Sequence, residues 1–389
     1  MQDILTRAHA ASPEALALRR LIHRRPELGN AEHETSALIV RTLKALGWEV
    51  ARPVGTSVMA TLEGAKPGRT VALRADMDAL RIREETGLPF ASEIPGVMHA
   101  CGHDFHTAAL LGAAMVLTGY RQAMKGRVRL LFQPDEEGSG GAARMIAAGC
   151  VEGVDAVFGA HVDPDLPAGT AGFKYGKMYA ASDVFKVTVL GEGCHGASPE
   201  AGVDAIAVAA QAVTALQQIV SRRLAPTDAA VITVGSFHAG AQANVVADRA
   251  ALEGIMRTLG PDTRRRVKAL FNETVAGLCA AMGARAEIDI RESYPGVVND
   301  DGMVDFAKNT AVRLLGGANV VTLDTPTMAT EDFGYFTQAV PGAFYRIGVG
   351  NPDVGAVWPI HSPKFVADEA AMPKLIALHA GMALSFLRQ

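Results

Sequence analysis

The sequence predicts a layered α/β protein that carries an inserted ferredoxin-like α+β domain. Over residues 1–181, short apolar segments typical of buried strands alternate with helical segments, as in a sheet covered by helices. Over 182–293 the predicted order becomes β-α-β-β-α-β, the order of a split ferredoxin-like unit. Mixed helix and strand return over 294–389. We therefore expect one domain made of residues 1–181 and 294–389, interrupted by a second at 182–293.

The first part of the chain is read from its helix boundaries and apolar runs. Ser12-Pro13-Glu14 predicts a helix start, with a capping hydroxyl and proline in the first turn, and Pro26 ends that helix. The segment at 70–74 is apolar without alternation, which fits a strand buried on both faces. The other elements expected here are helices at 32–46, 108–117 and 141–148, and strands at 57–62, 127–132 and 155–160.

The inserted and final parts follow by the same reasoning. The inserted domain should contain strands at 185–190, 230–237, 245–256 and 285–290, and helices at 203–221 and 261–282. The final part should contain helix and strand segments at 302–315, 319–323, 333–340 and 344–349, and a terminal helix from Asp368.

Composition is that of an ordinary globular chain. It has 389 residues, 49% hydrophobic and 20% charged, with a formal net charge of -4, so neither nucleic acid nor an anionic membrane is expected as a partner. The four cysteines have no disulfide spacing, and the N-terminus lacks the features of a signal peptide. We expect a cytoplasmic protein whose substrate is a small molecule bound in a pocket.

Residues 99–106 concentrate groups that bind transition metals. This stretch holds one thiol, three imidazoles and a carboxylate: His99, Cys101, His103, Asp104 and His106. Thiolate and imidazole are ligands preferred by zinc and similar metals. No second cluster follows at zinc-finger spacing. The alternative is a polar loop with one buried cysteine and solvated histidines.

Further candidate ligands follow the predicted strands of the first domain. Asp76 and Asp78 follow the strand at 70–74, the carboxylates of 135–137 follow the next strand, and His161 follows the strand at 155–160. His361 lies in a loop before the last helix. Each alone also fits a turn, a cap or an acidic surface loop. Together they suffice for two metals that share a bridging ligand.

Several motifs, in this order along the chain, carry a resemblance to a known family. They are Arg74-Ala75-Asp76-Met77-Asp78-Ala79-Leu80, Met98-His99-Ala100-Cys101-Gly102-His103-Asp104, Gln133-Pro134-Asp135-Glu136-Glu137-Gly138, Thr330-Glu331-Asp332-Phe333 and His361-Ser362-Pro363. The chain resembles the amidohydrolase branch of the dinuclear aminoacylase and carboxypeptidase G superfamily. That branch includes hippurate hydrolases, N-acyl-amino-acid deacylases and hydrolases of auxin–amino acid conjugates.

The resemblance implies a dinuclear metallohydrolase site in the layered domain. The implied metal ligands are Cys101, His103, Glu137, His161 and His361, with Cys101 as the bridge. Glu136 is implied as general base, and Asp76 as the group that orients a ligand. Arg74 stands where the wider superfamily has a metal-binding histidine. Two divalent ions per subunit are expected, zinc or manganese first and cobalt or nickel as alternatives.

The same resemblance makes the inserted domain a lid and dimerisation domain. His195 is implied to stabilise the oxyanion, from its own subunit or from the partner. Asn244 and Arg257 resemble groups that hold the carboxylate of the amino acid product, although Ala247 stands where the family often has proline. A homodimer or a dimer of dimers is expected.

The expected reaction is hydrolysis of the amide bond of N-acyl-L-amino acids, with N-acetyl, N-benzoyl or indole-acetyl groups as the acyl part. The alternatives are a dipeptidase or carboxypeptidase of the same superfamily, a cysteine hydrolase with Cys101 as nucleophile and His103 or His106 as base, and a metal-binding protein without catalysis. The sequence leaves the preferred acyl group, the amino acid and the metal open.

Overall fold

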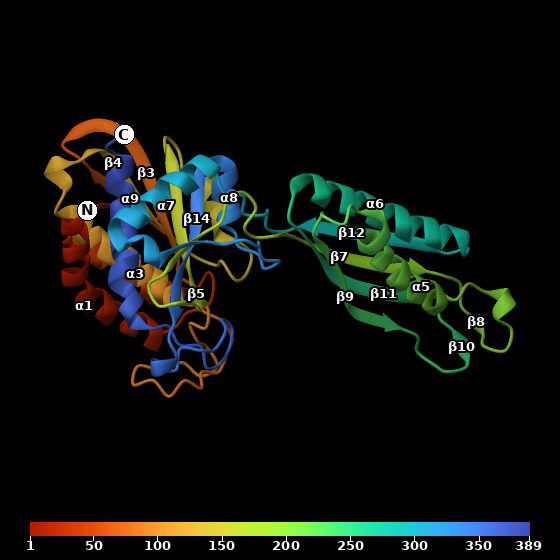
Figure 1. The fold of residues 1–389 in the computed structure, drawn as a ribbon. Helices are drawn as coiled ribbons and strands as arrows, with labels where there is room; N and C mark the ends of the chain where they lie inside the picture. The colour runs from red at the N-terminus through yellow and green to blue at the C-terminus, as the bar shows by residue number, and fades with distance from the viewer. The chain divides into compact units, whose positions relative to one another are not determined.

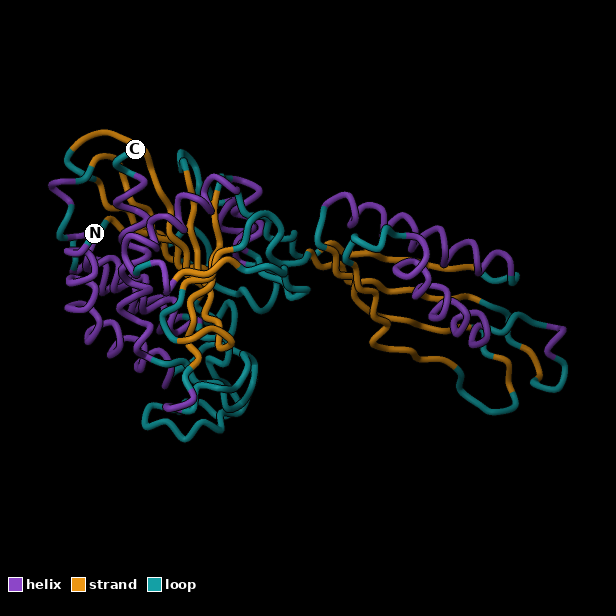
Figure 2. Tube along the Cα trace, in the orientation of Figure 1, coloured by secondary structure: helices purple, strands orange, loops and turns teal.

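The computed structural model describes all residues, 1–389, and the chain forms two compact units (Figure 1). The first unit comprises Met1–Gly176, Val298–Thr325 and Asp332–Gln389. The second comprises Lys177–Val297 and Pro326–Glu331. The first unit is therefore built from chain segments that come before and after the second in the sequence. Figure 2 shows helices and strands in each unit.

The first unit is organised on an 8-stranded sheet in the order β1-β2-β4-β3-β5-β14-β6-β13. Its strands are β1 (Glu49–Ala51), β2 (Val58–Glu63), β3 (Lys66–Asp76), β4 (Lys125–Gln133), β5 (Ala156–Pro167), β6 (Ala171–Phe173), β13 (Val320–Thr322) and β14 (Gly342–Gly350). The central strands β4, β3, β5 and β14 run parallel. Because β3 lies between β4 and β5, the order of the strands reverses there. Carboxyl ends of parallel strands at such a point form a crevice suited to a binding site.

Helices cover this sheet. They are α1 (Gln2–Arg24), α2 (His33–Ala45), α3 (His103–Thr118), α4 (Gly141–Ala147), α7 (Asp301–Leu315), α8 (Phe333–Ala339) and α9 (Met372–Phe386). α1, α3 and α9 pack against one another, and Figure 1 shows them side by side. Nearly every side chain of α3 is buried, as expected for a helix that is apolar on all sides. None of the helices combines the length and the apolar character that a membrane-spanning helix needs.

Two helices begin earlier than the sequence predicts. α1 starts at Gln2 and continues through Pro13, because Ile4, Ala8 and Ala15 form one buried stripe along it. The Ser12 hydroxyl donates to the Ala8 carbonyl at 2.7 Å and so bonds to the preceding turn instead of capping a new helix. α3 starts at His103, so half of the cysteine and histidine cluster is helical and not loop.

The second unit has the predicted ferredoxin-like order. Its antiparallel sheet runs β12-β7-β11-β9, from the strands β7 (Ala181–Leu190), β9 (Ala230–Ala239), β11 (Arg249–Thr258) and β12 (Arg285–Glu292). Helices α5 (Ala205–Gln218) and α6 (Pro261–Ala281) share a core with one face of this sheet, including Phe185, Leu216 and Phe271. A two-stranded ribbon, β8 (Cys194–His195) with β10 (Val245–Val246), extends from one end of the unit (Figure 1).

Candidate metal and catalytic site

The candidate site lies where β3, β4 and β5 approach their carboxyl ends. Asp76 ends β3 and Gln133 ends β4. The expectation that His161 follows its strand is wrong, because β5 continues through that residue to Pro167. His161 is therefore a strand residue, held by the register of β5 against β14. A ligand in a paired strand is positioned more rigidly than one in a loop.

The turn before α3 brings two candidate ligands to this edge of the sheet. Gly102 has a φ of 82°, in the left-handed region that favours glycine. A Cβ atom there would come within 2.6 Å of Val162 Cγ2 in β5. Only glycine lets the backbone turn so close to β5, and the turn places Cys101 and His103 on either side of it.

Two groups of possible ligands share Cys101. Cys101, His103 and His161 form the first, and Cys101, Glu137 and His361 form the second, with the ligand atoms of each group within 4.8 Å of one another. Cys101 Sγ lies 3.3 Å from Nε2 of both His161 and His361. His361 Nε2 is also 3.1 Å from Glu137 Oε1. This arrangement could hold two cations with the thiolate between them.

The ring nitrogens of two histidines are arranged for metal binding. His161 Nδ1 lies 2.7 Å from the Val162 carbonyl and must donate to it, which leaves the lone pair on Nε2. His103 Nδ1 lies 3.2 Å from Asp78 Oδ1, while its Nε2 is buried without a hydrogen-bond partner. A buried ring nitrogen without a partner is costly unless a ligand completes it. Both rings thus fit a metal bound through Nε2.

The electrostatics of the site also fit cations. Burial, together with the carboxylates of Glu137 and Glu136, raises the pKa of the Cys101 thiol well above its usual value. Burial opposes charge on His103, but Asp76 and Asp78 raise its pKa to about 10. The surroundings therefore favour positive charge at His103 and disfavour a free thiolate. A divalent cation would supply that charge and stabilise the thiolate.

The two glutamates are fixed by a tight turn. Asp135 has a φ of 57°, uncommon for a residue other than glycine. Its carboxylate accepts from Ser139 and Arg144, and its backbone N–H donates to the buried Glu32. Glu137 N–H donates to Asp78 Oδ2 at 2.9 Å. Glu136 is buried, and a carboxylate oxygen of it lies within 4.8 Å of ligand atoms of His103 and Glu137.

A buried network of charged side chains adjoins the candidate site through Asp76. Arg74 donates to Asp76 at 2.7 Å and to Asp332 at 2.8 Å, and all three side chains are fully buried. Gln133 links Arg74 to Asp332 by accepting at 2.8 Å and donating at 2.9 and 2.7 Å. Arg74 is thus an internal counterion. Our sequence reasoning gave no role to Gln133 or Asp332, although both lie in the quoted motifs.

Hydrogen bonding differs from the role expected of Asp76. Asp76 Oδ1 lies 2.6 Å from His106 Nδ1, and His106 Nε2 accepts from Val162 N–H at 2.9 Å. Both His106 nitrogens are therefore occupied. Asp78, not Asp76, is within hydrogen-bond distance of His103 Nδ1, since Asp76 comes only within 3.8 Å of His103 Nε2. In a continuous strand two residues this far apart would point to the same face, but β3 ends at Asp76, so Asp78 lies beyond the strand and is free to point elsewhere.

The second unit carries the predicted substrate-binding residues. His195 is exposed, accepts from Ala197 N–H through Nδ1 at 3.0 Å and pairs with Val245 in the ribbon. The Asn244 carbonyl accepts from Gly196 N–H at 2.8 Å, so Asn244 lies beside His195. Arg257 stands on β11, half-buried, and its Nη1 is buried without a hydrogen-bond partner. Burial lowers the pKa of Arg257.

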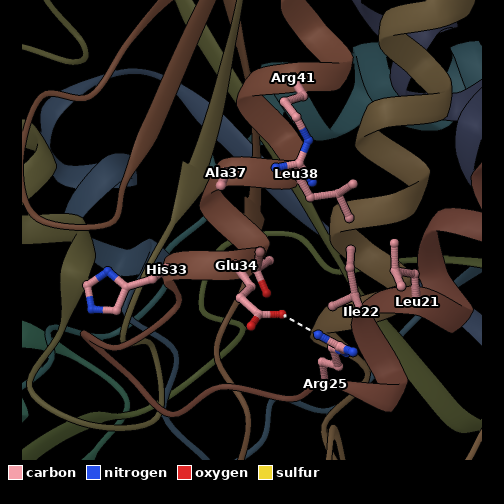
Figure 3. Close-up of a pocket in the computed structure, with 9 residues that line it drawn as sticks. Leu21, Ile22, Arg25, His33, Glu34, Ala37, Leu38 and Arg41 are labelled. Carbon is pink, nitrogen blue, oxygen red and sulfur yellow. Dashed lines mark hydrogen bonds and ion pairs between the residues drawn. The ribbon is translucent and has the colours of Figure 1, made fainter.

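A separate hollow of about 450 Å³ lies between α1 and α2 (Figure 3). Leu21, Ile22 and Leu38 line its apolar part, and the Arg25–Glu34 ion pair at 3.3 Å crosses it. It contains none of the candidate ligands. The hollow is therefore not part of the candidate site.

The family is decided by a match to its sequence model. Residues 72–385 match the model described as peptidase family M20/M25/M40. The chain belongs to this family. The matched range includes every candidate ligand, Glu136 and the whole second unit.

Individual relatives agree with this membership. The chain is 39% identical to thermostable carboxypeptidase 1 of Saccharolobus solfataricus, over 95% of each chain. It is 41% identical to N-acetyl-L-cysteine deacetylase of Bacillus subtilis, over 96% of this chain and 90% of the relative. A crystal structure from Bacillus subtilis, described as a dinuclear metal binding peptidase from the M20 family, matches with a TM-score of 0.87 and 35% identity over 98% of this chain and 99% of that one.

Membership of this M20 family makes the chain a metal-dependent hydrolase of the amidohydrolase and peptidase type. Groups able to hold metal lie together at the carboxyl edge of its first sheet. The resemblance drawn from the sequence motifs is confirmed, and so is the layered α/β class of the fold.

Proposed function

We propose that the protein hydrolyses the amide bond of N-acyl-L-amino acids, releasing a carboxylic acid and a free amino acid. The observation that carries the proposal is the pair of ligand groups that share Cys101, with the Glu136 carboxylate beside them. The relative named N-acetyl-L-cysteine deacetylase, at 41% identity, supports an acyl amino acid as the substrate class. N-acetyl, N-benzoyl and indole-acetyl groups are the acyl parts we would test.

Two divalent ions per subunit are proposed as the cofactors. Cys101, His103 and His161 would hold one ion, and Cys101, Glu137 and His361 the other. The orphan Nε2 of His103 and the thiol with a raised pKa support this assignment. Zinc or manganese suits this mixed thiolate, imidazole and carboxylate set best, with cobalt or nickel next. When bound, the ions would polarise the amide carbonyl and lower the pKa of water toward neutrality.

Glu136 is proposed as the general base. Its carboxylate would take a proton from the attacking water and later give it to the leaving amine nitrogen. Asp332 N–H lies 3.3 Å from Glu136 Oε1 and supports a fixed carboxylate orientation. The neighbouring Glu137 faces His361 and so is proposed to serve as a ligand.

Arg257 is proposed to bind the free carboxylate of the substrate. Its buried Nη1 has no hydrogen-bond partner, and a guanidinium in that state favours an anionic ligand. Asn244 would assist with a polar contact, and His195 would donate to the oxyanion of the tetrahedral intermediate.

The length of β11 separates Arg257 from His195 and Asn244 within one subunit. Arg249 pairs with Leu190, close to the ribbon that carries His195, whereas Arg257 pairs with Ser182 at the other end of β7. Eight residues of strand span about 27 Å. One small substrate cannot contact both ends of the same sheet. We therefore propose a homodimer in which His195 and Asn244 act on the partner's substrate, or a dimer of such dimers.

The proposal is tested with Glu136→Gln and its matched neighbour Glu137→Gln. Glu136→Gln should keep two bound metals and lose about 10²–10⁴-fold in kcat on the N-acyl amino acid that the wild type cleaves best. Glu137→Gln should instead lose metal, measured by elemental analysis after gel filtration. Full activity of Glu136→Gln on every N-acyl amino acid would reject the proposed base and mechanism.

Carboxypeptidase action is the second candidate function, supported by the relative named thermostable carboxypeptidase 1 at 39% identity. Dipeptides and N-acyl amino acids both present an amide next to a free carboxylate, so comparing their kcat/KM decides between them.

A cysteine hydrolase is disfavoured, because burial and nearby carboxylates raise the pKa of Cys101 and make it a poor nucleophile. Four unpaired cysteines support a reducing, cytoplasmic setting.

A further inference from the structure

Two ionisable residues occupy the buried stripe of α1. Arg19 and His23 lie one helical turn apart, with exposed fractions of 2% and 1%. Ile4, Ala8 and Ala15 hold the equivalent positions earlier in the helix. Charged side chains at core positions require partners of opposite charge.

The partners come from three different segments. Arg19 Nε donates to Asp104 Oδ2 at 3.0 Å, and His23 Nδ1 lies 2.9 Å from the same oxygen. His23 Nε2 lies 3.2 Å from Glu84 Oε1. Arg19 Nη1 reaches Glu369 Oε1 at 3.2 Å. Two cations on one helix therefore hold three carboxylates, and we call these five side chains the α1 strap.

Each carboxylate lies next to, or in a loop continuous with, a segment that holds a candidate metal ligand. Asp104 directly follows His103 at the start of α3. Glu84 lies in the loop that leads to Cys101, and the N–H of the next residue, Glu85, donates to the Pro363 carbonyl two residues after His361. Glu369 begins the 3-10 turn after the His361 loop.

Aromatic rings fix the same guanidinium. Arg19 Cζ lies 5.6 Å from the ring centre of Phe90, in the Glu84 loop, and 5.1 Å from that of Phe105, in α3. The His23 ring meets Phe90 edge-on at 5.5 Å between centres. The arginine is thus oriented by both segments that it joins, and has little freedom to adopt another rotamer.

The strap carries two positive and three negative charges, and its two buried carboxylates are each matched by a cation. Burial opposes the charge of His23, but Asp104 and Glu84 raise its pKa to about 9, so Arg19 and His23 face Asp104 and Glu84 as two ion pairs. Arg20 adds a cation from the exposed side of Glu369. Buried ion pairs contribute little net stability compared with apolar packing, so their presence at core positions is better explained by a role in geometry.

We propose that Arg19 and His23 are positioning residues for the metal site, acting through Asp104, Glu84 and Glu369 on the segments that present Cys101, His103 and His361. This inference rests on the proposed metal-dependent function. The strap touches no candidate ligand itself. It fixes the start of α3 and the two loops against one rigid helix, and so fixes the distances between ligands.

The test measures cobalt binding to the chelator-treated full-length protein and the cobalt absorption spectrum. Arg19→Met and His23→Gln should weaken Co²⁺ affinity by about 10–100-fold, measured by competition with a chromogenic chelator. The thiolate-to-cobalt absorption band should shift, and kcat should fall more than KM rises. Arg20→Ala is the matched control, since Arg20 contacts Glu369 but neither Asp104 nor Glu84, and it should behave as the wild type.

Should Arg19→Met fail to fold, Glu84→Gln provides a second test of the proposal. In the wild type, the Glu84 carboxylate accepts a hydrogen bond from Ser92 N–H at 2.7 Å. The glutamine removes one charge but keeps a carbonyl oxygen that can accept this bond. It too should shift the cobalt band and weaken binding about 10-fold. Folded variants with wild-type affinity, spectrum and kcat would overturn the strap while leaving the proposed function intact. A wild type that binds no metal and cleaves no amide would instead reject the proposed function.

Discussion

The separation of His195 from Arg257 gives a sharp prediction about subunit cooperation. Both residues belong to one compact unit, and β11 places its ribbon end and its Arg257 end about 27 Å apart. If each catalytic centre uses the Arg257 of its own chain, it must take His195 from a partner. Two chains with different defects should then restore one another.

The perturbation combines Glu136→Gln in one chain with His195→Ala in the other. Alone, each variant should lose about 10²-fold or more in kcat, through loss of the proposed base or of the proposed oxyanion donor. Paired in one dimer, the chain that keeps Glu136 receives His195 from its partner, while the other site lacks both. One intact site of two predicts about half of the wild-type kcat per dimer.

The assay uses coexpressed chains with two different affinity tags, so that only mixed dimers are purified and measured. The control pairs a wild-type chain with one that carries both substitutions. In the crossed arrangement this control is inactive, because the wild-type chain receives a defective partner. If His195 serves its own subunit, the two results exchange: the control keeps half the activity and the test pair keeps almost none. That exchange would refute the crossed site.

Three further outcomes are expected. Dialysis against a strong chelator should abolish activity, and Zn²⁺, Mn²⁺ or Co²⁺ should restore it; turnover that survives verified metal removal contradicts the metal mechanism. Arg257→Ala should raise KM about 10-fold or more for substrates with a free carboxylate and hardly at all for their amides. An equal rise in KM for both kinds of substrate would contradict the proposal that Arg257 binds the carboxylate. The pKa of His23, raised from 6.5 to about 9, gives folding stability that is fully present below pH 6.5 and is lost as pH rises through 9. Such a shift amounts to about 3 kcal/mol. Urea unfolding of the metal-free wild type and of His23→Gln should show the difference in their unfolding free energies narrowing by this amount as the pH rises through that range. A difference that does not change with pH would show that His23 is not charged in the folded protein.

Much of the molecule could be predicted from local patterns. An apolar run without alternation marked the central strand β3, because strands of a parallel sheet are buried on both faces. The order of elements after Ser182 predicted the ferredoxin-like unit, since few topologies accommodate two helices on one face of four strands. The motifs around Cys101 and Glu136 indicate the family from the sequence alone.

Local signals failed where tertiary packing competes with them. Ser12-Pro13 has the composition of a helix start, yet the buried face of α1 extends without a break on both sides of it, so α1 continues through. The same competition put His161 inside β5 and His103 inside α3. In each case burial of a neighbouring apolar face outweighs the preference of one or two residues.

The sequence by itself determined which groups are available at this site: one thiol, several imidazoles and a pair of adjacent glutamates, in an order that specifies the family. Only the tertiary structure decided which atoms meet. It turned His103 toward Asp78, occupied both nitrogens of His106, made Arg74 an internal counterion and joined α1 to the start of α3 through Asp104. Except for the contact of Arg74 with Asp76, these contacts join residues that are 25 to more than 80 positions apart in the sequence. Such residues are brought together by the fold of the sheet and helices and not by local spacing.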